Sequence, residues 1–281
     1  MINSESDNSM RPLPKNRKGL FFEIIYAQSA ALFKISLLIT LFLLPLLAWM
    51  TVMSISDELL LIELEGAPSD MQSDILIKIF NKKLYGNLAS IPLFAFLFMG
   101  LGGISFVMRN LVWNELTFIW EDFKKGFKDN WRHSLMLGLL FGLIINSLNM
   151  MNWMLFGMKG GISGIVIYLF FLLIFISMFM FCMTQQVVYK NDFMHLIRNS
   201  MIMTFSRLIS NLFVLILTFS PFILLIFYSV SLPSLIVLIA MALSGFGYMA
   251  LILTLYSHSV FDKYINAQHY PQLVNKGIGR N

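Results

Sequence analysis

The sequence predicts an all-α protein, a polytopic membrane helix bundle of six transmembrane helices plus two cytoplasmic amphipathic helices, with the N- and C-termini inside. Hydrophobic residues make up 58% of the 281 positions and charged residues only 12%. A soluble domain has about 45–50% apolar and about 25% charged residues. Six apolar segments, each near the about 20 residues that a helix needs to cross the hydrocarbon core, alternate with polar connections.

The predicted spans follow one another at fairly even spacing along the chain. They cover about residues 35–52, 88–108, 135–154, 162–183, 212–230 and 234–258. Pro45 and Pro221 lie inside two of these spans and are expected to kink them. Gly138 and Gly142 stand four positions apart in the third span, a spacing that favours close packing of helices in a bilayer.

The membrane domain covers residues 19–265, between a disordered cytoplasmic tail at 1–18 and a polar cytoplasmic tail at 266–281. Its longest connection, residues 57–83, is acidic and is expected to form an extracellular loop with a short interfacial helix capped by Ser69. Only four of the 20 Lys and Arg residues fall outside in this arrangement, which leaves 16 in the cytoplasm. The positive-inside rule therefore orients both termini inward in the cell membrane. The same bias accounts for the net charge of +5, so we expect no nucleic-acid partner.

The stretch from Arg109 to Leu135 predicts a helix that lies along the cytoplasmic membrane surface. Asn114 and Glu115 are typical of a helix start. Apolar residues then recur every three or four positions and form one stripe, with charged residues on the other side. The candidate contact residues are Trp120, Phe123, Lys124, Lys125, Phe127 and Trp131. Two interpretations remain: a docking surface for a cytoplasmic partner, or aromatic rings in the headgroup region with lysines that meet anionic lipid.

A second surface helix is predicted to begin at Asn191 and Asp192. A shift of 77 positions superposes these two residues on Asn114 and Glu115. Both regions therefore have the pattern of span, capped surface helix and span. This pattern indicates a duplicated unit whose copies share one orientation, unlike the inverted repeats of many transporters.

Three asparagines share one face of the third span near its outer end. They are Asn146, Asn149 and Asn152. This polar face predicts contact with a polar substrate or a ladder of hydrogen bonds between helices, and polar residues commonly hold helices together in membranes.

No catalytic, cofactor-binding or metal-binding residues are predicted. None of the six spans carries an ionisable residue near its centre, where such groups usually mark proton or ion routes. The four histidines are scattered rather than placed at metal-ligand spacing, and Cys182 is the only cysteine. A phosphate-binding loop of the G-x-x-x-x-G-K-[ST] type is absent from the sequence. We therefore expect a non-enzymatic protein without a cofactor.

Four stretches resemble the YesL-like family of bacterial integral membrane proteins, which is classed under a domain of unknown function. They read NLASIPLFAFLFMGLGGISFVMR (87–109), FKKGFKDNWRHSLMLG (123–138), YKNDFMHLIRNSMIMTFSRLISNL (189–212) and VFDKYI (260–265). The chain departs from this family in its long acidic connection at 57–83, where the resemblance implies a short one. The resemblance implies a helical inner-membrane protein of Gram-positive bacteria, encoded with carbohydrate uptake and degradation systems.

The function that this resemblance implies is an accessory, assembly or regulatory subunit linked to carbohydrate ABC transport, with ABC transporter subunits as partners. The alternative is a permease that moves a small polar solute on its own. A polar-lined cavity within the spans favours the permease, whereas a solid bundle with an exposed apolar groove favours the accessory subunit.

Overall fold

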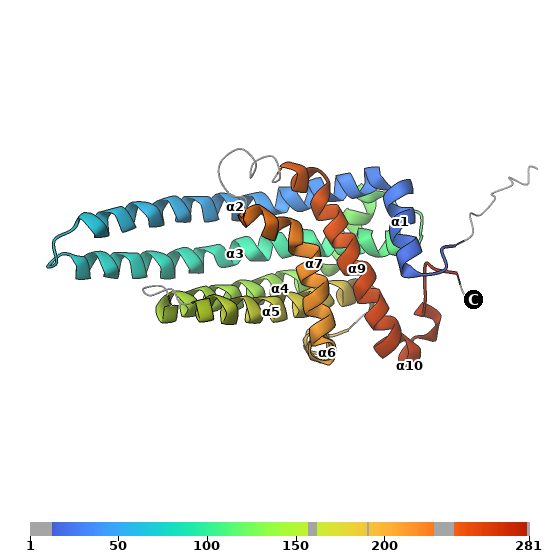
Figure 1. The fold of residues 1–281 in the computed structure, drawn as a ribbon. Coiled ribbons are helices and arrows are strands. Elements are labelled where there is room, and N and C mark those ends of the chain that lie inside the picture. The colour runs from blue at the N-terminus through green and yellow to red at the C-terminus, as the bar shows by residue number, and fades with distance from the viewer. Residues whose placement is uncertain (1–12, 157–161, 190, 228–238, 280–281) are drawn as a thin grey trace, which may run out of the picture.

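The computed structural model describes residues 13–156, 162–189, 191–227 and 239–279, and every regular element in that part of the chain is helical (Figure 1). The predicted all-α class is therefore confirmed. The main helices are α1 (Arg17–Ala27), α2 (Ser29–Gly66), α3 (Gln72–Val112), α4 (Ile119–Phe156), α5 (Ile162–Val188), α6 (Phe193–Ser206), α7 (Leu208–Phe227) and α9 (Phe246–Phe261). Shorter elements are the π-helical turns η1 (Met241–Gly245) and η2 (Asp262–Asn266), then α10 (Ala267–His269) and the 3-10 turn η3 (Pro271–Leu273).

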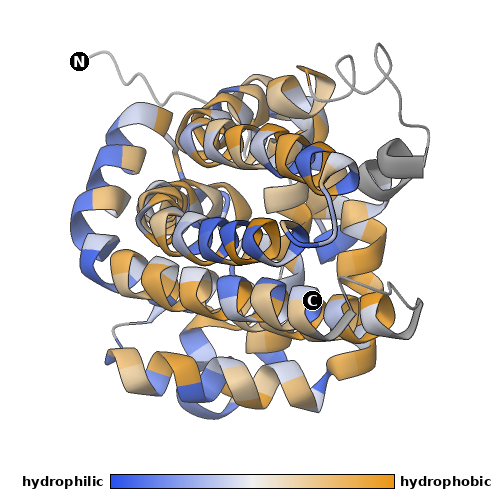
Figure 2. Cartoon of the chain, turned by 90° about the vertical axis from the view of Figure 1, so that its left-hand side faces the viewer, coloured by the Kyte–Doolittle hydropathy of each residue, from blue (hydrophilic) through white to orange (hydrophobic). Residues whose placement is uncertain are grey.

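The helices α2 to α5 run side by side along one axis, whereas α7 and α9 cross them obliquely (Figure 1). We call the end where α2 turns into α3 the hairpin end, and the opposite end, which holds α1 and α10, the termini end. Figure 2 looks at the bundle from the hairpin end and shows hydrophobic residues all along the helices, with hydrophilic residues gathered at the α2–α3 turn.

Four helical segments are long and apolar enough to cross a membrane. They are Ser29–Gly66, Gln72–Val112, Ile119–Met154 and Gly164–Val188. The pair α6 and α7 forms a fifth if its two parts count as one span, although they are bent by 91° at the break. The sixth predicted span begins in residues that lie outside the described part, and its remainder forms η1 and α9. The number of six spans is thus not confirmed.

The predicted surface helix at 109–135 is wrong as a separate element. α3 continues to Val112, and α4 then runs without a break from Ile119 to Phe156. Asn114 does not start the helix, because it lies in the turn with a φ of 54°. The cap comes instead from Asp122, whose carboxylate accepts a hydrogen bond of 2.9 Å from the backbone N–H of Phe118. No residue in the sequence of α4 interrupts it, so the amphipathic turns and the apolar span form one rod of about 57 Å.

The predicted interfacial helix within residues 57–83 is also wrong as a separate element. α2 continues to Gly66 and α3 begins at Gln72, so this connection is the tip of a long antiparallel hairpin. Ser69 lies in the turn and does not cap the helix, because the N-cap position belongs to Met71. Across this hairpin, Lys78 pairs with Glu63, and both Lys82 and Lys83 pair with Asp57.

The structure confirms a separate second helix after Asp192, while its position on the membrane surface stays a prediction. α6 begins after Asp192 and ends at Ser206, where the chain bends into α7. Asn211 stabilises this break, since its side-chain amide donates a hydrogen bond of 2.9 Å to the carbonyl oxygen of Thr204. The two related regions therefore differ in shape, one continuous and one bent, and their duplication stays a prediction.

Small residues hold α3 and α4 close together, as the spacing of Gly138 and Gly142 predicts. A Cβ atom added to Gly138 would lie 2.6 Å from the Cα of Ala95, and one added to Gly142 would lie 3.2 Å from the Cα of Ile91. Farther along the same contact, a Cβ on Gly126 would lie 3.1 Å from a backbone oxygen of α3. Close approach of this kind is typical of helix pairs in membranes.

The first and last described segments of the chain meet at the termini end of the bundle. Contrary to the predicted disordered tail, residues 13–18 are ordered, and the carboxamide of Asn16 caps α1 by accepting a hydrogen bond of 2.7 Å from the N–H of Gly19. The C-terminal segment returns to the same place, where the backbone N–H of Gly279 donates a hydrogen bond of 3.0 Å to the carbonyl oxygen of Pro14. Residues 1–12 of the predicted tail lie outside the described part.

Candidate functional site

A cavity with a partly polar lining lies between α2, α3, α4 and α5 towards the hairpin end. Its volume is about 400 Å³, within the range of about 300–1,000 Å³ that is usual for small-molecule sites. The side chains that line it with polar groups are Trp49, Ser54, Asp57, Lys83, Asn87, Ser90, Asn146, Asn149 and Tyr168. The other lining residues are Leu46, Met50, Met53, Gly86, Phe94, Ile145, Met150 and Trp153. Polar and aromatic groups thus converge from four helices on one space.

Asn146 forms the buried inner part of the polar wall. Its side chain is 7% exposed, and its Nδ2 donates a hydrogen bond of 2.9 Å to Oγ of Ser90 on α3. The hydroxyl of Ser90 in turn donates a hydrogen bond of 2.7 Å to the carbonyl oxygen of Asn87. This chain of hydrogen bonds fixes the orientation of the Asn146 carboxamide at the cavity surface.

Asn149, one helical turn farther along α4, links the wall to α5. Its Oδ1 accepts a hydrogen bond of 2.7 Å from the hydroxyl of Tyr168. Asn152 does not line the cavity, and its buried Oδ1 has no hydrogen-bond partner among the described residues. Two of the three predicted asparagines therefore meet in the cavity. They also make the predicted hydrogen bonds between helices.

The charged rim of the cavity was not predicted. The carboxylate of Asp57 on α2 lies 2.7 Å from the amines of both Lys82 and Lys83 on α3. Both lysines donate hydrogen bonds to this carboxylate, so its charge is paired within the protein. The side chains of Asp57 and Lys83 are 29% and 24% exposed, so this pair stands at the border between the cavity and solvent.

A periodic signal for this rim was present in the sequence. Trp49, Met53 and Asp57 recur every four positions on α2, and all three line the cavity. The predicted span ended at residue 52 because the hydropathy falls there, whereas the helix and its inward face continue. The indole N–H of Trp49 donates a hydrogen bond of 3.0 Å to the carbonyl oxygen of Gly86. This bond holds the ring against the cavity.

Aromatic rings close the cavity towards the termini end. Phe94 lines the cavity and packs on Phe141, with ring centroids 5.5 Å apart. Phe141 in turn packs on Phe98 at 5.0 Å and on Phe179 at 4.8 Å. Phe98 and Phe179 are buried, and together with Phe141 they line a second, apolar cavity, so these rings lie between the two cavities.

The predicted contact stripe on α4 is divided between the core and the surface. Phe123 is buried in the main core, and Phe127 packs against the same core, so neither is free to meet a partner. The reason is the close approach of α4 to α3, where a Cβ on Gly103 would lie 2.7 Å from the Phe123 ring. Trp120 and Trp131 remain 57% and 41% exposed.

The two candidate lysines extend over aromatic rings at the start of α4. The amine of Lys124 lies 5.0 Å from the ring centroid of Trp120. The amine of Lys125 lies 5.6 Å from the ring centroid of Phe106. These distances are within the reach of cation–π attraction.

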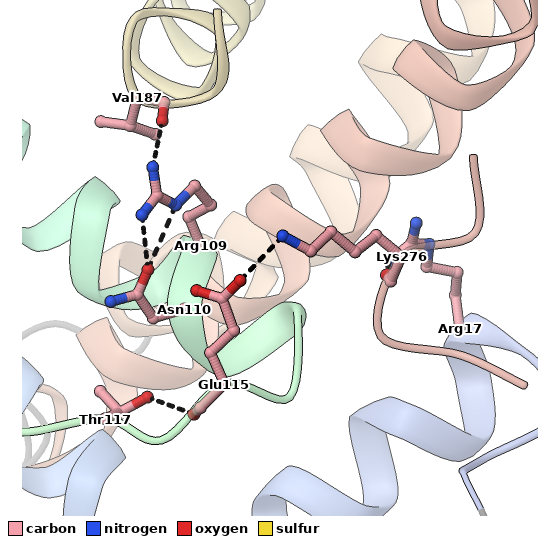
Figure 3. Close-up of polar contacts among 7 residues, drawn as sticks. All are labelled: Arg17, Arg109, Asn110, Glu115, Thr117, Val187 and Lys276. Carbon is pink, nitrogen blue, oxygen red and sulfur yellow. Dashed lines mark hydrogen bonds and ion pairs between the residues drawn. The ribbon is translucent and has the colours of Figure 1, made fainter. Parts of the chain in front are cut away.

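A second group of polar residues, at the termini end, is structural (Figure 3). Arg109 donates a hydrogen bond of 2.6 Å to the carbonyl oxygen of Val187 and one of 2.7 Å to Oδ1 of Asn110. Glu115 accepts a hydrogen bond of 2.8 Å from the amine of Lys276. This contact connects the C-terminal segment to the α3–α4 turn. Because protein groups satisfy these charges, the cluster joins segments rather than presenting an open site.

The described residues contain no group of three or more His, Cys, Asp or Glu side chains that could hold a metal ion. Cys182 is fully buried. The cavity wall offers hydrogen-bonding groups, one charged pair and aromatic surface.

The fold and this cavity define the class: an all-α bundle whose longest helices are apolar enough to span a membrane, with a polar cavity near one end. In comparisons with known proteins, no family model, no curated protein and no solved structure matches the chain.

Proposed function

We propose that the chain is a multi-pass protein of the cell membrane that binds a small polar solute in the hairpin-end cavity and serves as a permease for it. The observation that carries this proposal is the convergence of Asn146, Asn149 and the Asp57–Lys83 pair on one cavity. Carboxamides both donate and accept hydrogen bonds, so they suit a solute rich in hydroxyl groups. Trp49 and Trp153 add aromatic faces to the wall, on which the apolar face of a sugar ring packs.

The orientation of the bundle supports an extracellular mouth. The basic residues concentrate on the connections of the termini end, so the positive-inside rule assigns the hairpin end to the outside. The aromatic layer of Phe94, Phe141, Phe98 and Phe179 then closes the path inward. This arrangement corresponds to an outward-facing state, and transport requires that the layer open. The proposed role is non-enzymatic and needs no cofactor.

A screen of solutes against the purified full-length protein tests the binding step. Its panel contains monosaccharides, disaccharides, polyols and amino acids, and the readout is thermal stability in detergent, which rises when a ligand binds the folded state. We expect one hydroxyl-rich class to raise the melting temperature. The effect should disappear in Asn146→Leu and Asn149→Leu and persist in the matched control Asn152→Leu, because Asn152 does not line the cavity. A shift that survives in both cavity variants contradicts the proposal, as does a panel without any shift.

The second candidate function is an accessory subunit linked to carbohydrate ABC transport. Besides the family resemblance, an exposed apolar patch at the start of α4 favours it. Leu116, Phe118 and Trp120 are 83%, 57% and 57% exposed, and Lys124 lies over the Trp120 ring. Large aromatic residues beside a positive charge are common at protein interfaces.

Purification in mild detergent with identification of co-purifying proteins tests this second function. A docking patch predicts that ABC transporter subunits are retained by the wild type and lost in Leu116→Ala and Trp120→Ala. The matched control is Leu59→Ala, because Leu59 is also exposed but lies on α2 towards the hairpin end. If no transporter subunit is retained by the wild type, the patch has no such partner.

A further inference from the structure

The bend between α6 and α7 forms a basic pocket that the solute site does not involve. Its volume is about 500 Å³, and it adjoins η2 at the termini end. The lining residues are Phe205, Ser206, Arg207, Leu208, Ile209, Ser210, Lys263 and Tyr264. We propose that this pocket binds the phosphate of an anionic phospholipid headgroup.

Two cations converge on one tyrosine in this pocket. Nε of Arg207 donates a hydrogen bond of 3.0 Å to the hydroxyl of Tyr264. The guanidinium of Arg207 and the amine of Lys263 lie 5.4 Å and 5.6 Å from the centroid of the same ring. Tyr264 thus holds both positive groups near each other at the protein surface.

No carboxylate lines the pocket to neutralise these cations. The acidic residue nearest to Lys263 in the sequence is Asp262. It forms an ion pair of 2.6 Å with Arg17 and accepts a hydrogen bond of 2.8 Å from the side chain of Asn266. Neither Arg207 nor Lys263 forms an ion pair within the described part of the chain. The pocket therefore carries two uncompensated positive charges.

The bend adds further donors to the same pocket. The chain turns by 91° at Arg207, so the first residues of α7, Leu208, Ile209 and Ser210, line the pocket. The backbone N–H groups of a first helical turn have no acceptor within the helix, and their partial positive charge favours an anion. α4 has no such bend. The backbone N–H groups at the equivalent positions of α4 therefore bond to carbonyl groups of the same helix.

Exposed apolar residues beside the cations point to a lipid rather than to free phosphate. Phe205, Ile209 and Phe213 are 57%, 84% and 67% exposed on the helices that form the bend. Free phosphate gains nothing from these side chains, whereas the acyl chains of a phospholipid cover them while its phosphate meets Arg207 and Lys263. Basic pockets between membrane helices commonly bind anionic headgroups in this way.

Titration of the full-length protein in detergent with short-chain phosphatidylglycerol tests the proposal, with thermal stability as the readout. Phosphatidylcholine and inorganic phosphate are the comparison ligands. We expect phosphatidylglycerol to bind most tightly, and each of Arg207→Gln and Lys263→Gln to weaken it roughly fivefold. Lys18→Gln is the matched control, because it removes an exposed cation that lies outside the pocket at the termini end and should leave the affinity unchanged.

Each alternative outcome decides against a particular part of the proposal. Equal stabilisation by inorganic phosphate identifies a free-anion site and overturns the lipid assignment. Equal stabilisation by phosphatidylcholine, or unchanged affinity in both pocket variants, overturns the role of the cations. Because Arg207→Gln also removes the hydrogen bond to Tyr264, Lys263→Gln keeps the test decisive if the former variant is unstable.

Discussion

Arg17 and Asp262 are separated by 245 positions in the sequence and form an ion pair of 2.6 Å at the termini end. Their side chains are only 15% and 12% exposed, so little water screens the pair. The contact joins the N-terminal helix α1 to the last part of the bundle. With the hydrogen bond between Gly279 and Pro14, it holds the first and last described segments of the chain in one place.

Replacement of this arginine is the first test of that closure. Arg17→Gln leaves the mostly buried carboxylate of Asp262 without its cation, which should cost about 2 kcal/mol of folding free energy. Thermal unfolding in detergent measures the loss. Lys18→Gln is the control, because Lys18 is exposed and forms no ion pair in the described structure. Equal melting temperatures for wild type and Arg17→Gln contradict a structural role for the pair.

The rim of the cavity predicts a stabilising role for the ion pairs between α2 and α3. Asp57→Asn removes the carboxylate charge that lies 2.7 Å from the amines of Lys82 and Lys83. This change should lower stability by about 1 kcal/mol. Melting curves check the loss, with Asp70→Asn at the exposed hairpin turn as the control. Equal melting temperatures for wild type and Asp57→Asn argue against the ion pairs.

The contact between α3 and α4 predicts graded effects of bulky side chains. Gly138→Leu should destabilise the bundle by about 2–3 kcal/mol, because its Cβ meets backbone atoms that cannot move aside. Gly142→Leu should cost less, since the nearest Cα is 3.2 Å away rather than 2.6 Å. Gly66→Leu should have little effect because nothing lies within 4 Å of its Cβ position. The order of the three melting temperatures is the measurement, and a reversed order contradicts this packing.

The orientation in the membrane predicts which positions an impermeant thiol reagent reaches. Ser69→Cys, at the turn between α2 and α3, should react when the reagent is added outside intact cells. Lys124→Cys, near the start of α4, should react only after the cells are opened. Labelling of the cysteine at position 124 from outside reverses the topology and removes the extracellular mouth of the cavity.

Features that depend on local pattern were predictable from the sequence. Composition and apolar segment length indicate an all-α membrane bundle, and the spacing of Gly138 and Gly142 indicates a close helix contact. The separate amphipathic helix α6 was also predictable from its period, whereas the bend that follows it was not, because the same pattern runs straight in α4.

Features that depend on continuity or on tertiary pairing were not predictable in the same way. An amphipathic segment has the same period whether it lies on a membrane or continues into a span, so the start of α4 was assigned to a separate helix. Asn114 has a side chain typical of a cap but adopts a left-handed conformation instead. Asn146 and Asn149 were found from their shared face, whereas Asp57 and Lys83 come together only because the hairpin continues past the apolar residues.

Protection of a cysteine inside the cavity tests solute binding most directly. Cys182 is fully buried and leaves a low background, while Ser54 is exposed and lines the cavity. The measurement is the rate of thiol labelling of Ser54→Cys in membranes, with and without the solute that raises the melting temperature, beside the control Ser73→Cys on the exposed hairpin. Solute binding in the cavity predicts slower labelling at position 54 and an unchanged rate at position 73. Equal rates at position 54 with and without saturating solute contradict the proposed site.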